Sequence, residues 1–350
     1  MSSVLRLPPF PKGWYSIGFS DELPPGSVTT HKLAGRELVV FRTESGELSA
    51  VDPICPHLGA HLGHGGSVTG ETLRCPFHGF LFGTDGACVA TSYGTKPPKV
   101  RARTWSILEN HDTVFVWFDP KGEPPSFDIP PLDMRSYVPL TRAKYRFRGH
   151  PQDTTENSVD IGHLTVVHGY ERPKMLGDLR EEGAALHATY EFYRPIGLFG
   201  KGFGGVRAEF DAHVHGLGYS FVEARTPALG LEFRYFVFAT PVDEMDLELR
   251  IAGAVRKLET CDLKGPLKPL GFSRHAARAV EPLVQERSFR VFQSDVEQDF
   301  KIWKYKEFVP RPALAIGDGP VMKYRRWAEQ FYDELVTGKG SGVAEAAAGS

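Results

Sequence analysis

Hydrophobic and polar residues alternate along much of the chain, which is the pattern of half-buried β-strands. In the first third, runs of this kind cover residues 37–43 and 113–118. Five longer runs follow at residues 183–194, 204–216, 217–226, 231–242 and 245–257. Residues 273–306 show helical periodicity instead. The pattern predicts an α+β protein, with an all-β N-terminal part and a C-terminal twisted antiparallel sheet wrapped by helices.

The chain divides at a proline-rich segment. Glycine (37 residues) and proline (27 residues) are frequent, so we expect many tight turns. Residues 119–133 contain five prolines and are typical of a linker. We therefore expect two domains, residues 1–125 with a core at about 14–118, and residues 126–336. The small and polar residues 337–350 are expected to form a disordered tail.

Composition excludes several classes of protein. Hydrophobic residues make up 41% of the chain, which is enough for a folded core. The 41 Lys and Arg residues nearly balance the 43 Asp and Glu residues, so we expect no nucleic acid partner. No apolar run reaches the roughly 18 residues of a membrane span, and no secretory signal is visible. Four cysteines do not make a disulfide scaffold. We therefore expect a cytoplasmic protein.

Two Cys/His pairs carry the strongest chemical signal. Cys55 and His57 form a Cys-x-His motif, and Cys75 and His78 form a Cys-x-x-His motif in a second Gly/Pro-rich turn. Two such loops can converge on one inorganic centre. A Rieske [2Fe–2S] cluster requires two Cys ligands on one iron and two His ligands on the other.

The alternative for these pairs is a structural Cys2His2 zinc site. Zinc fingers usually pair Cys with Cys and His with His, whereas each loop here has one of each, which favours the cluster. His61 and His64 lie in the same loop as His57, and spacing alone does not exclude them as ligands. Cys88 and Cys261 have no partner in a motif and are expected to be inert thiols.

A second metal site is predicted beyond the linker. His163 and His168 lie five residues apart, and Asp160 precedes His163 by three. On a helix these residues share a face if the last turn loosens, which Gly169 permits. Two imidazoles and one distant carboxylate form the facial triad of non-haem Fe(II) oxygenases, which leaves positions open for O2.

The predicted C-terminal helix offers the carboxylate. Asp295, Glu297 and Asp299 lie near its centre. We select Asp299, which an apolar turn through Ile302 and Trp303 follows, as the third iron ligand. Asp295 lies one turn earlier on the same face and is the second choice. A surface helix with incidental acids is the alternative.

Together these motifs resemble the α-subunits of Rieske non-haem iron oxygenases across nearly the whole chain. Within this family the chain looks most like the steroid and sterol branch. The stretches CPHLGAHLGHGG, CPFHGF and TWSILENHDTVFVWFD are similar to cholesterol 7-desaturases. The C-terminal stretches DFKIWKYK and DGPVMKYRRWAEQFYDE are similar to the oxygenase component of 3-ketosteroid 9α-hydroxylase. Respiratory Rieske proteins have two more cysteines, at positions matching Ala60 and Phe77, which are absent here. The resemblance implies a Rieske domain followed by a helix-grip catalytic domain.

The resemblance also implies residue roles. In the cluster, Cys55 and Cys75 would hold one iron, and His57 and His78 the other. The mononuclear Fe(II) would be held by a separate set of three ligands, namely His163, His168 and Asp299.

Electron transfer between subunits is implied as well. Asp160 would link the cluster of one subunit to the mononuclear iron of the next in a homotrimer, with Asn157 as a weaker candidate for a supporting role. The electrons of NAD(P)H would arrive through a separate ferredoxin reductase or reductase/ferredoxin pair, because the chain has no dinucleotide fingerprint of its own.

The implied function is O2-dependent hydroxylation or desaturation of a sterol or steroid, as part of steroid or lipid metabolism. Ring hydroxylation of an aromatic acid, a Rieske electron carrier and a zinc-containing lipid-binding protein are the alternatives. An aromatic acid would require a cation in the pocket. His213 and His215 are expected to be ordinary strand histidines. Candidate pocket residues are Leu198, Phe199, Phe203, Phe221, Phe236 and Phe238.

Overall fold

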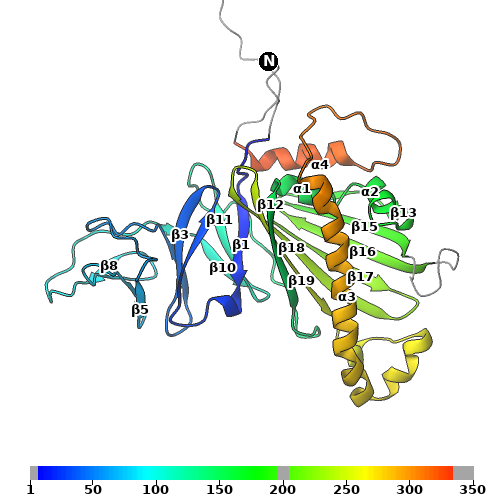
Figure 1. The fold of residues 1–350 in the computed structure, drawn as a ribbon, viewed down its shortest axis with the longest axis horizontal. Helices are drawn as coiled ribbons and strands as arrows, with labels where there is room; N and C mark the ends of the chain where they lie inside the picture. Colours follow the sequence, from blue (N-terminus) through cyan, green and yellow to red (C-terminus); the bar gives the residue numbers. More distant parts are fainter. Residues whose placement is uncertain (1–6, 195–204, 334–350) are drawn as a thin grey trace, which may run out of the picture.

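The computed structural model describes residues 7–194 and 205–333. Its N-terminal part contains three small antiparallel sheets (Figure 1). The first sheet has the order β1 (Gly13–Phe19), β11 (Thr113–Phe118), β10 (Ile107–Asn110). The second has the order β2 (Val28–Leu33), β3 (Arg36–Arg42), β4 (Leu48–Val51), β9 (Thr104–Trp105). The third has the order β5 (Ser67–Thr69), β6 (Thr72–Arg74), β7 (Leu81–Phe82), β8 (Cys88–Ala90).

The C-terminal part is built on one large antiparallel sheet. Its strands are, in spatial order, β12 (Thr141–Arg148), β19 (Asp246–Val255), β18 (Leu231–Asp243), β17 (Tyr219–Thr226), β16 (Val206–His215), β15 (Ala185–Arg194) and β13 (Glu171–Met175), with β14 (Arg180–Glu182) also paired to β15. The helices are α1 (Pro151–Glu156), α2 (Gly162–Val166), α3 (Arg274–Trp303) and α4 (Val321–Ala328). Short 3-10 turns lie at Ser20–Glu22, Leu258–Thr260, Gly265–Phe272 and Glu329–Phe331.

The five long alternating runs of the sequence correspond to β15 to β19. One face of β15 packs against apolar residues while the other carries charges, whereas β18 is covered by apolar residues on both faces. The long helical segment corresponds to α3, which begins after Ser273. The Ser273 side chain caps the helix by accepting a hydrogen bond from the Ala276 N–H at 3.3 Å. The predicted α+β class is confirmed.

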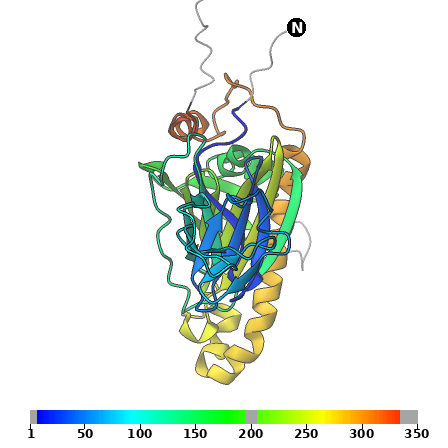
Figure 2. The same ribbon diagram turned by 90° about the vertical axis from the view of Figure 1, so that its left-hand side faces the viewer.

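The long helix and the N-terminal sheets lie on opposite faces of the large sheet (Figures 1 and 2). The N-terminal side is joined by an aromatic cluster that includes Trp14 and Trp117 of the first sheet and Phe236 of β18. The Arg250 guanidinium, which is 3% exposed, donates hydrogen bonds from β19 to the main-chain carbonyls of Ser16 (3.0 Å) and Ile17 (2.7 Å). The contact orients the two parts with directional bonds as well as apolar packing.

Helices α3 and α4 pack on the other side of the sheet. Phe289, Val296 and Trp303 of α3 are buried against β18 and β19. Tyr324 and Trp327 of α4 are buried against a second cluster on β15 and β16. Among the described helices, none is both long enough and apolar enough to cross a membrane.

Candidate metal centres and substrate pocket

The two Cys/His loops have the same main-chain hydrogen bonds. The Cys55 N–H donates to the Ala60 carbonyl (2.8 Å), and the Gly59 N–H donates to the Cys55 carbonyl (3.0 Å). In the second loop the Cys75 N–H donates to the Phe80 carbonyl (2.8 Å), and the Gly79 N–H donates to the Cys75 carbonyl (3.1 Å). Both glycines have a positive φ, +79° and +65°, which a residue with a side chain adopts only with strain.

These loops bring the four predicted ligands together. The Cys55 and Cys75 thiols are buried at 2% exposure, whereas the imidazoles of His57 and His78 are half-buried. The centroids of the two imidazole rings are 4.8 Å apart, and the His57 ring stacks on Phe80. The thiols therefore lie inside and the imidazoles near the surface, where electrons can enter or leave.

The four side chains provide the donors of a two-iron Rieske cluster, with one thiol and one imidazole from each loop. Burial and the neighbouring Cys75 thiol raise the pKa of Cys55 to about 11, although the main-chain N–H groups of His57 and Leu58 oppose the rise. Two neighbouring buried thiols need a positive centre beside them to exist as thiolates.

His61 and His64 turn away from this group. The ring of His61 stacks on that of His64 at 4.1 Å, its Nδ1 accepts a hydrogen bond from the Gly63 N–H (3.1 Å), and its Nε2 faces Glu37 at 3.7 Å. Of the three histidines in this loop, His57 is the one placed beside the two thiols.

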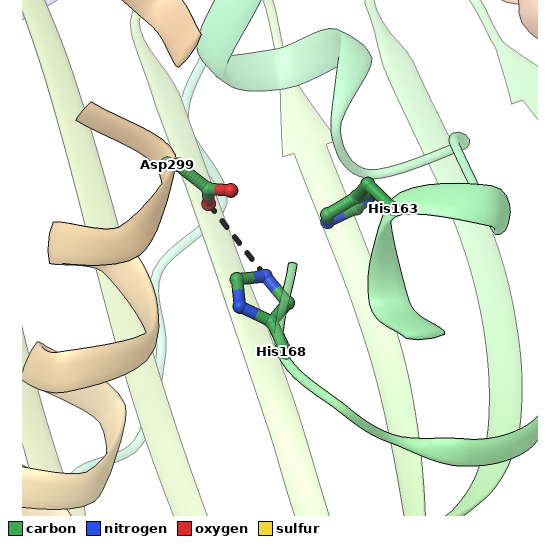
Figure 3. A group of neighbouring side chains, drawn as sticks. All are labelled: His163, His168 and Asp299. Atoms are coloured by element: carbon green, nitrogen blue, oxygen red, sulfur yellow. Dashed lines mark ion pairs between the residues drawn. The ribbon is translucent and has the colours of Figure 1, made fainter. Parts of the chain in front are cut away.

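The second predicted group also comes together. His163 lies on α2, His168 follows the end of α2, and Asp299 lies on α3 (Figure 3). One ligand atom from each of the three lies within 4.8 Å of the other two, and His168 Nε2 is 3.7 Å from Asp299 Oδ2. The helix α2 ends at Val166, so the chain turns before His168, and Gly169 (φ +69°) continues the turn. Two imidazoles and one carboxylate are the donors of a facial-triad iron site.

The charge balance of this group favours a bound cation. Burial raises the pKa of Asp299 to about 7, against the opposing effects of His163 and Asn157, and the charges of Asp295 and Asp160 add to the rise. The pKa of His168 is lowered, by burial and by the nearby His163. A buried carboxylate beside an imidazole with a lowered pKa is stabilised in its charged form by a metal ion.

Asp160 lies beside His163, and Asn157 lies beside Asp299. The Asp160 carboxylate accepts a hydrogen bond from the His163 main-chain N–H (3.2 Å) and lies 3.7 Å from His163 Nδ1. Asn157 accepts a hydrogen bond from the Trp303 indole (3.4 Å) and interacts with the Asp299 side chain. Both positions agree with supporting roles next to the metal ligands.

Asp295, the second choice for the third ligand, belongs to a different network. Its carboxylate accepts hydrogen bonds from the Tyr170 hydroxyl (2.7 Å) and from the Arg194 guanidinium (2.9 Å). Arg194 also lies over the Tyr170 ring, 5.2 Å from its centroid. The carboxylate is thus already neutralised. The geometry therefore places Asp299, and not Asp295, with the two histidines.

Sequence reasoning missed Gln298. Its side-chain oxygen lies 3.2 Å from His168 Nδ1, so the N–H of His168 can point at Gln298 and leave Nε2 free to face Asp299. Hydrogen bonds of this kind fix the tautomer and ring orientation of metal-binding histidines. The one available signal was its position directly before Asp299. That position did not reveal contact with a histidine from another element.

A pocket of about 170 Å³ opens beside the three ligands, between α3 and the sheet. Its walls are mainly apolar. The lining residues beyond the metal ligands include Leu164, Tyr190, Phe210, Ala212, Ser220, Val222, Tyr235, Val237, Val291, Phe292 and Val296. A hydrophobic molecule in this pocket would reach the potential iron site directly.

The expectation for Phe221, Phe236 and Phe238 is wrong. Side chains alternate along a strand, and in β18 Tyr235 and Val237 face the pocket, so Phe236 and Phe238 face the opposite side. There they pack, with Phe221, against the N-terminal part.

Other residues weighed from the sequence stand apart from the pocket. Leu198, Phe199 and Phe203 lie outside the described residues. His213 shares the face of the sheet that carries Phe221, and its Nδ1 contacts the Nδ1 of His187 (2.8 Å). Neither His213 nor His215 belongs to a group of three potential metal ligands in the described ranges.

Two family matches cover nearly the whole chain. Residues 13–102 match the Rieske [2Fe-2S] domain, and residues 116–332 match the 3-ketosteroid 9α-hydroxylase C-terminal domain. A cholesterol 7-desaturase of Ciona intestinalis is 32% identical over 94% of this chain and 70% of its own length. The oxygenase component of a 3-ketosteroid 9α-monooxygenase of Rhodococcus rhodochrous is 28% identical over 93% of this chain and 82% of its own.

Solved structures share the fold at low identity. The Pseudomonas putida NdmA structure with caffeine has a TM-score of 0.66 at 17% identity, covering 90% of this chain and 89% of its own. Dicamba monooxygenase bound to dicamba has a TM-score of 0.60 at 19% identity, covering 91% and 96%. With the family matches on both halves, the chain belongs to the Rieske oxygenases that carry the 3-ketosteroid 9α-hydroxylase C-terminal domain, oxidoreductases that use a Rieske [2Fe–2S] cluster, a mononuclear non-haem iron and O2.

Proposed function

We propose that the protein is the terminal oxygenase of a Rieske-type system and that it hydroxylates or desaturates a sterol or steroid. The observation that carries this proposal is the placement of His163, His168 and Asp299 at an apolar pocket. An apolar pocket suits a substrate with few polar groups. Relatives named for cholesterol and for 3-ketosteroids support the same substrate class, and with it a place in steroid or lipid metabolism.

The proposed ligands follow from the two groups of side chains. Cys55, His57, Cys75 and His78 would hold the cluster, which supplies single electrons when bound. The mononuclear iron, which would supply O2 activation, would be held by His163, His168 and Asp299.

The protein's own contribution is to prepare the pocket. Gln298 orients the His168 ring through Nδ1. The Trp303 indole holds the Asn157 amide beside Asp299. The valine and phenylalanine side chains of α3 and the sheet exclude water from the substrate's reacting carbon. These contacts fix a hydrophobic substrate next to the metal ligands before electrons arrive.

A homotrimer explains how electrons reach the pocket. The cluster loops lie at the end of the chain's fold opposite to α2 and α3, so the two centres of one chain are far apart (Figure 1). Exposed apolar residues surround the cluster ligands, including Leu58 (66%) and Phe77 (63%). Exposed apolar residues also flank Asp160, including Val166 (86%) on α2 and Ile316 (109%) in the segment that bonds to Ile161 through Asp318.

These two apolar surfaces belong to opposite ends of the molecule and would meet in a head-to-tail ring of three subunits. Asp160 would then lie between a cluster histidine of one subunit and His163 of the next, and would pass electrons between the centres. The electrons would come from NAD(P)H through a separate ferredoxin reductase or reductase/ferredoxin pair.

An aromatic acid is a less suitable substrate. Recognition of its carboxylate would require a free cation in the pocket. Arg194 does line the pocket, but its guanidinium is bound to Asp295 and Tyr170. The pocket therefore offers no unneutralised arginine among its described lining residues, which favours an uncharged substrate.

We also propose that the domain division lies near residue 125, with a Rieske domain before it and a catalytic domain to residue 336. The linker contains Phe127, which packs between the two parts. A cytoplasmic location is supported by the cysteines, since none of the four forms a disulfide.

A single-turnover experiment tests the function. The reduced protein is exposed once to O2 with cholesterol, androstenedione or an aromatic acid, and products are identified by mass spectrometry. We expect a steroid product that is heavier by one oxygen atom or lighter by two hydrogen atoms. Oxidation of the aromatic acid alone would overturn the proposed substrate class.

A further inference from the structure

The aromatic ring of Tyr235 on β18 packs in a narrow space between β19 and α3. Gly253 is its partner on β19, and a Cβ atom at Gly253 would lie 2.7 Å from the Tyr235 ring, so only glycine leaves room for it. The Phe292 ring of α3 stacks on the other side, with centroids 4.5 Å apart and planes at 23°. The ring is therefore fixed between strand and helix, with its edge on the pocket.

Packing accounts for an aromatic ring at position 235 but not for the hydroxyl of Tyr235, because phenylalanine would fill the same space. The side chain is 8% exposed, and the polar contact of the hydroxyl within the part of the chain that the structure describes is with the Ser288 side chain. Ser288 is the polar side chain beside it, and the Ser288 hydroxyl donates to the Gln285 carbonyl at 3.0 Å. A buried tyrosine hydroxyl usually has a partner.

Most other hydroxyl groups around the pocket are already engaged. The Tyr170 hydroxyl donates to Asp295 (2.7 Å), the Tyr190 hydroxyl to the Ser158 carbonyl (2.5 Å), and the Thr154 hydroxyl to the Pro151 carbonyl (2.7 Å). Ser158, two residues before Asp160, and Ser220 also have hydroxyls without a hydrogen bond in the described ranges.

Ser220 and Tyr235 lie at different positions along their strands. Ser220 pairs with Val237, whereas Tyr235 pairs with Val222 and stacks on Phe292. Phe292 precedes Asp299 by seven residues on α3, which corresponds to a rise of about 10 Å along the helix axis. Tyr235 thus lies at the end of the pocket that is remote from the metal ligands.

We propose that Tyr235 determines substrate specificity by donating a hydrogen bond to an oxygen atom at the end of the substrate remote from the reacting carbon. This inference rests on the proposed function and adds one requirement to it. The substrate is an elongated, mainly apolar molecule with a terminal ketone or hydroxyl oxygen. A molecule without that oxygen leaves the tyrosine hydroxyl with Ser288 as its polar neighbour and without a partner in the pocket.

The acid–base state of Tyr235 agrees with a donor role. Burial raises the pKa of the phenol, and the smaller effects of Ser288 and Arg194 do not cancel the rise. The group therefore remains protonated at neutral pH and can donate.

The test compares Tyr235→Phe with the wild-type holoprotein, using androstenedione and analogues that lack one or the other ketone oxygen. Dissociation constants are measured by calorimetry, and iron content and the cluster spectrum are recorded for each variant. We expect Tyr235→Phe to weaken binding of androstenedione about 10-fold and to leave binding of one deoxygenated analogue unchanged. Tyr145→Phe is the matched control, since it removes a tyrosine hydroxyl that contacts Glu297 outside the pocket and should not change the preference for the ketone. Ser220→Ala tests whether a different hydroxyl of the pocket sets that preference.

The outcomes separate this inference from the proposed function. If androstenedione binds the wild-type protein but Tyr235→Phe binds the ketone and both analogues as the wild type does, the role of Tyr235 is overturned while the proposed function stands. A ketone preference that disappears in Ser220→Ala instead would also overturn it. If no steroid binds the wild-type protein and none is oxidised, the proposed function fails, and the inference fails with it.

Discussion

The Nε2 atom of His168 lies 3.7 Å from a carboxylate oxygen of Asp299, although the two residues come from different elements at opposite ends of the catalytic part. The segment after α2 supplies the imidazole, and α3 supplies the buried carboxylate. Because α3 crosses the large sheet, its position decides both the metal ligands and one wall of the pocket.

Replacing Asp299 should remove the mononuclear iron. We expect Asp299→Ala to lose that iron while the absorption spectrum of the cluster stays intact, because the two sites share no ligand. Glu297→Gln is the matched control, since this exposed residue on the same helix contacts Tyr145 and not the histidines. Iron loss in Asp295→Ala, with Asp299→Ala retaining iron, would contradict the assignment.

Gln298 should set the affinity for iron without being a ligand. We expect Gln298→Leu to weaken Fe(II) binding about 10- to 100-fold, because the His168 ring loses the partner of its Nδ1. Titration of the metal-free protein with Fe(II) measures this directly. Gln293→Leu makes the same chemical change on the same helix, where the side chain bonds Tyr145, and should leave the affinity unchanged. If Gln298→Leu binds Fe(II) with the same affinity as Gln293→Leu, the orienting role of Gln298 is ruled out.

Asp160 should control electron transfer and not metal content. We expect Asp160→Asn to keep both metal centres but to lose most of the turnover. The reduced cluster should then stay reduced when substrate and O2 are added, which stopped-flow absorption records. Rapid reoxidation of the cluster together with normal product yield would show that electrons take another route.

Glu156 should stabilise the fold through its contacts with α4 and the segment after α3. Burial by itself would raise the pKa of Glu156, but Arg325 and Lys306 outweigh burial and hold the pKa below its usual value. The Arg325 Nε–Glu156 oxygen distance is 2.7 Å. We expect Glu156→Gln to lower the free energy of unfolding by about 3 kcal/mol at neutral pH, because it leaves the buried Arg325 without its carboxylate partner, whereas Lys306 keeps Asp153.

The pH dependence of that difference has a definite sign. A lowered carboxyl pKa stabilises the fold above the usual value of 4.5, and the stabilisation is lost as the pH falls through the lowered value. The difference between Glu156→Gln and wild type should therefore shrink below about pH 4. Glu286→Gln, which removes an exposed pair with Arg290, should cost less than about 0.5 kcal/mol at any pH. A pH-independent difference for Glu156→Gln would refute this explanation.

Neighbouring residues on β18 should have separable effects. Phe236→Ala should lower the free energy of unfolding by about 3 to 5 kcal/mol, because Phe236 is fully buried against the N-terminal part, and should leave steroid affinity unchanged. Val237→Ala, one residue further, should weaken steroid binding at a smaller cost in stability, since Val237 lines the pocket. Denaturation curves and calorimetric measurements of steroid binding for both variants check this. The opposite pattern would mean that Phe236, and not Val237, faces the pocket.

These residues also show what the sequence could predict. The Cys-x-His and Cys-x-x-His loops were readable because cluster chemistry requires a short motif, and the glycines that close each loop lie within it. Alternation along residues 231–242 predicted the strand. It did not show whether Tyr235 or Phe236 faces the pocket, because both faces of this sheet are covered by apolar residues.

Contacts between distant segments were the least predictable. Asp295 and Asp299 share a helix face, and periodicity alone does not say which one meets the histidines. Arg194, at the end of β15, pairs with Asp295, and Asp299 is the carboxylate that lies with the histidines. Gln298 meets His168 for the same kind of reason, since sheet and helix packing sets the distance between them.

The central claim is that one chain holds a Rieske cluster and, beside the steroid pocket, a separate mononuclear iron. Electron paramagnetic resonance of the protein treated with nitric oxide tests it most directly. We predict two signals, one from the reduced cluster and one from the nitrosyl complex of the mononuclear iron, and we predict that androstenedione changes only the second. A cluster signal without a nitrosyl signal, in protein saturated with Fe(II), would contradict the claim and identify the protein as an electron carrier.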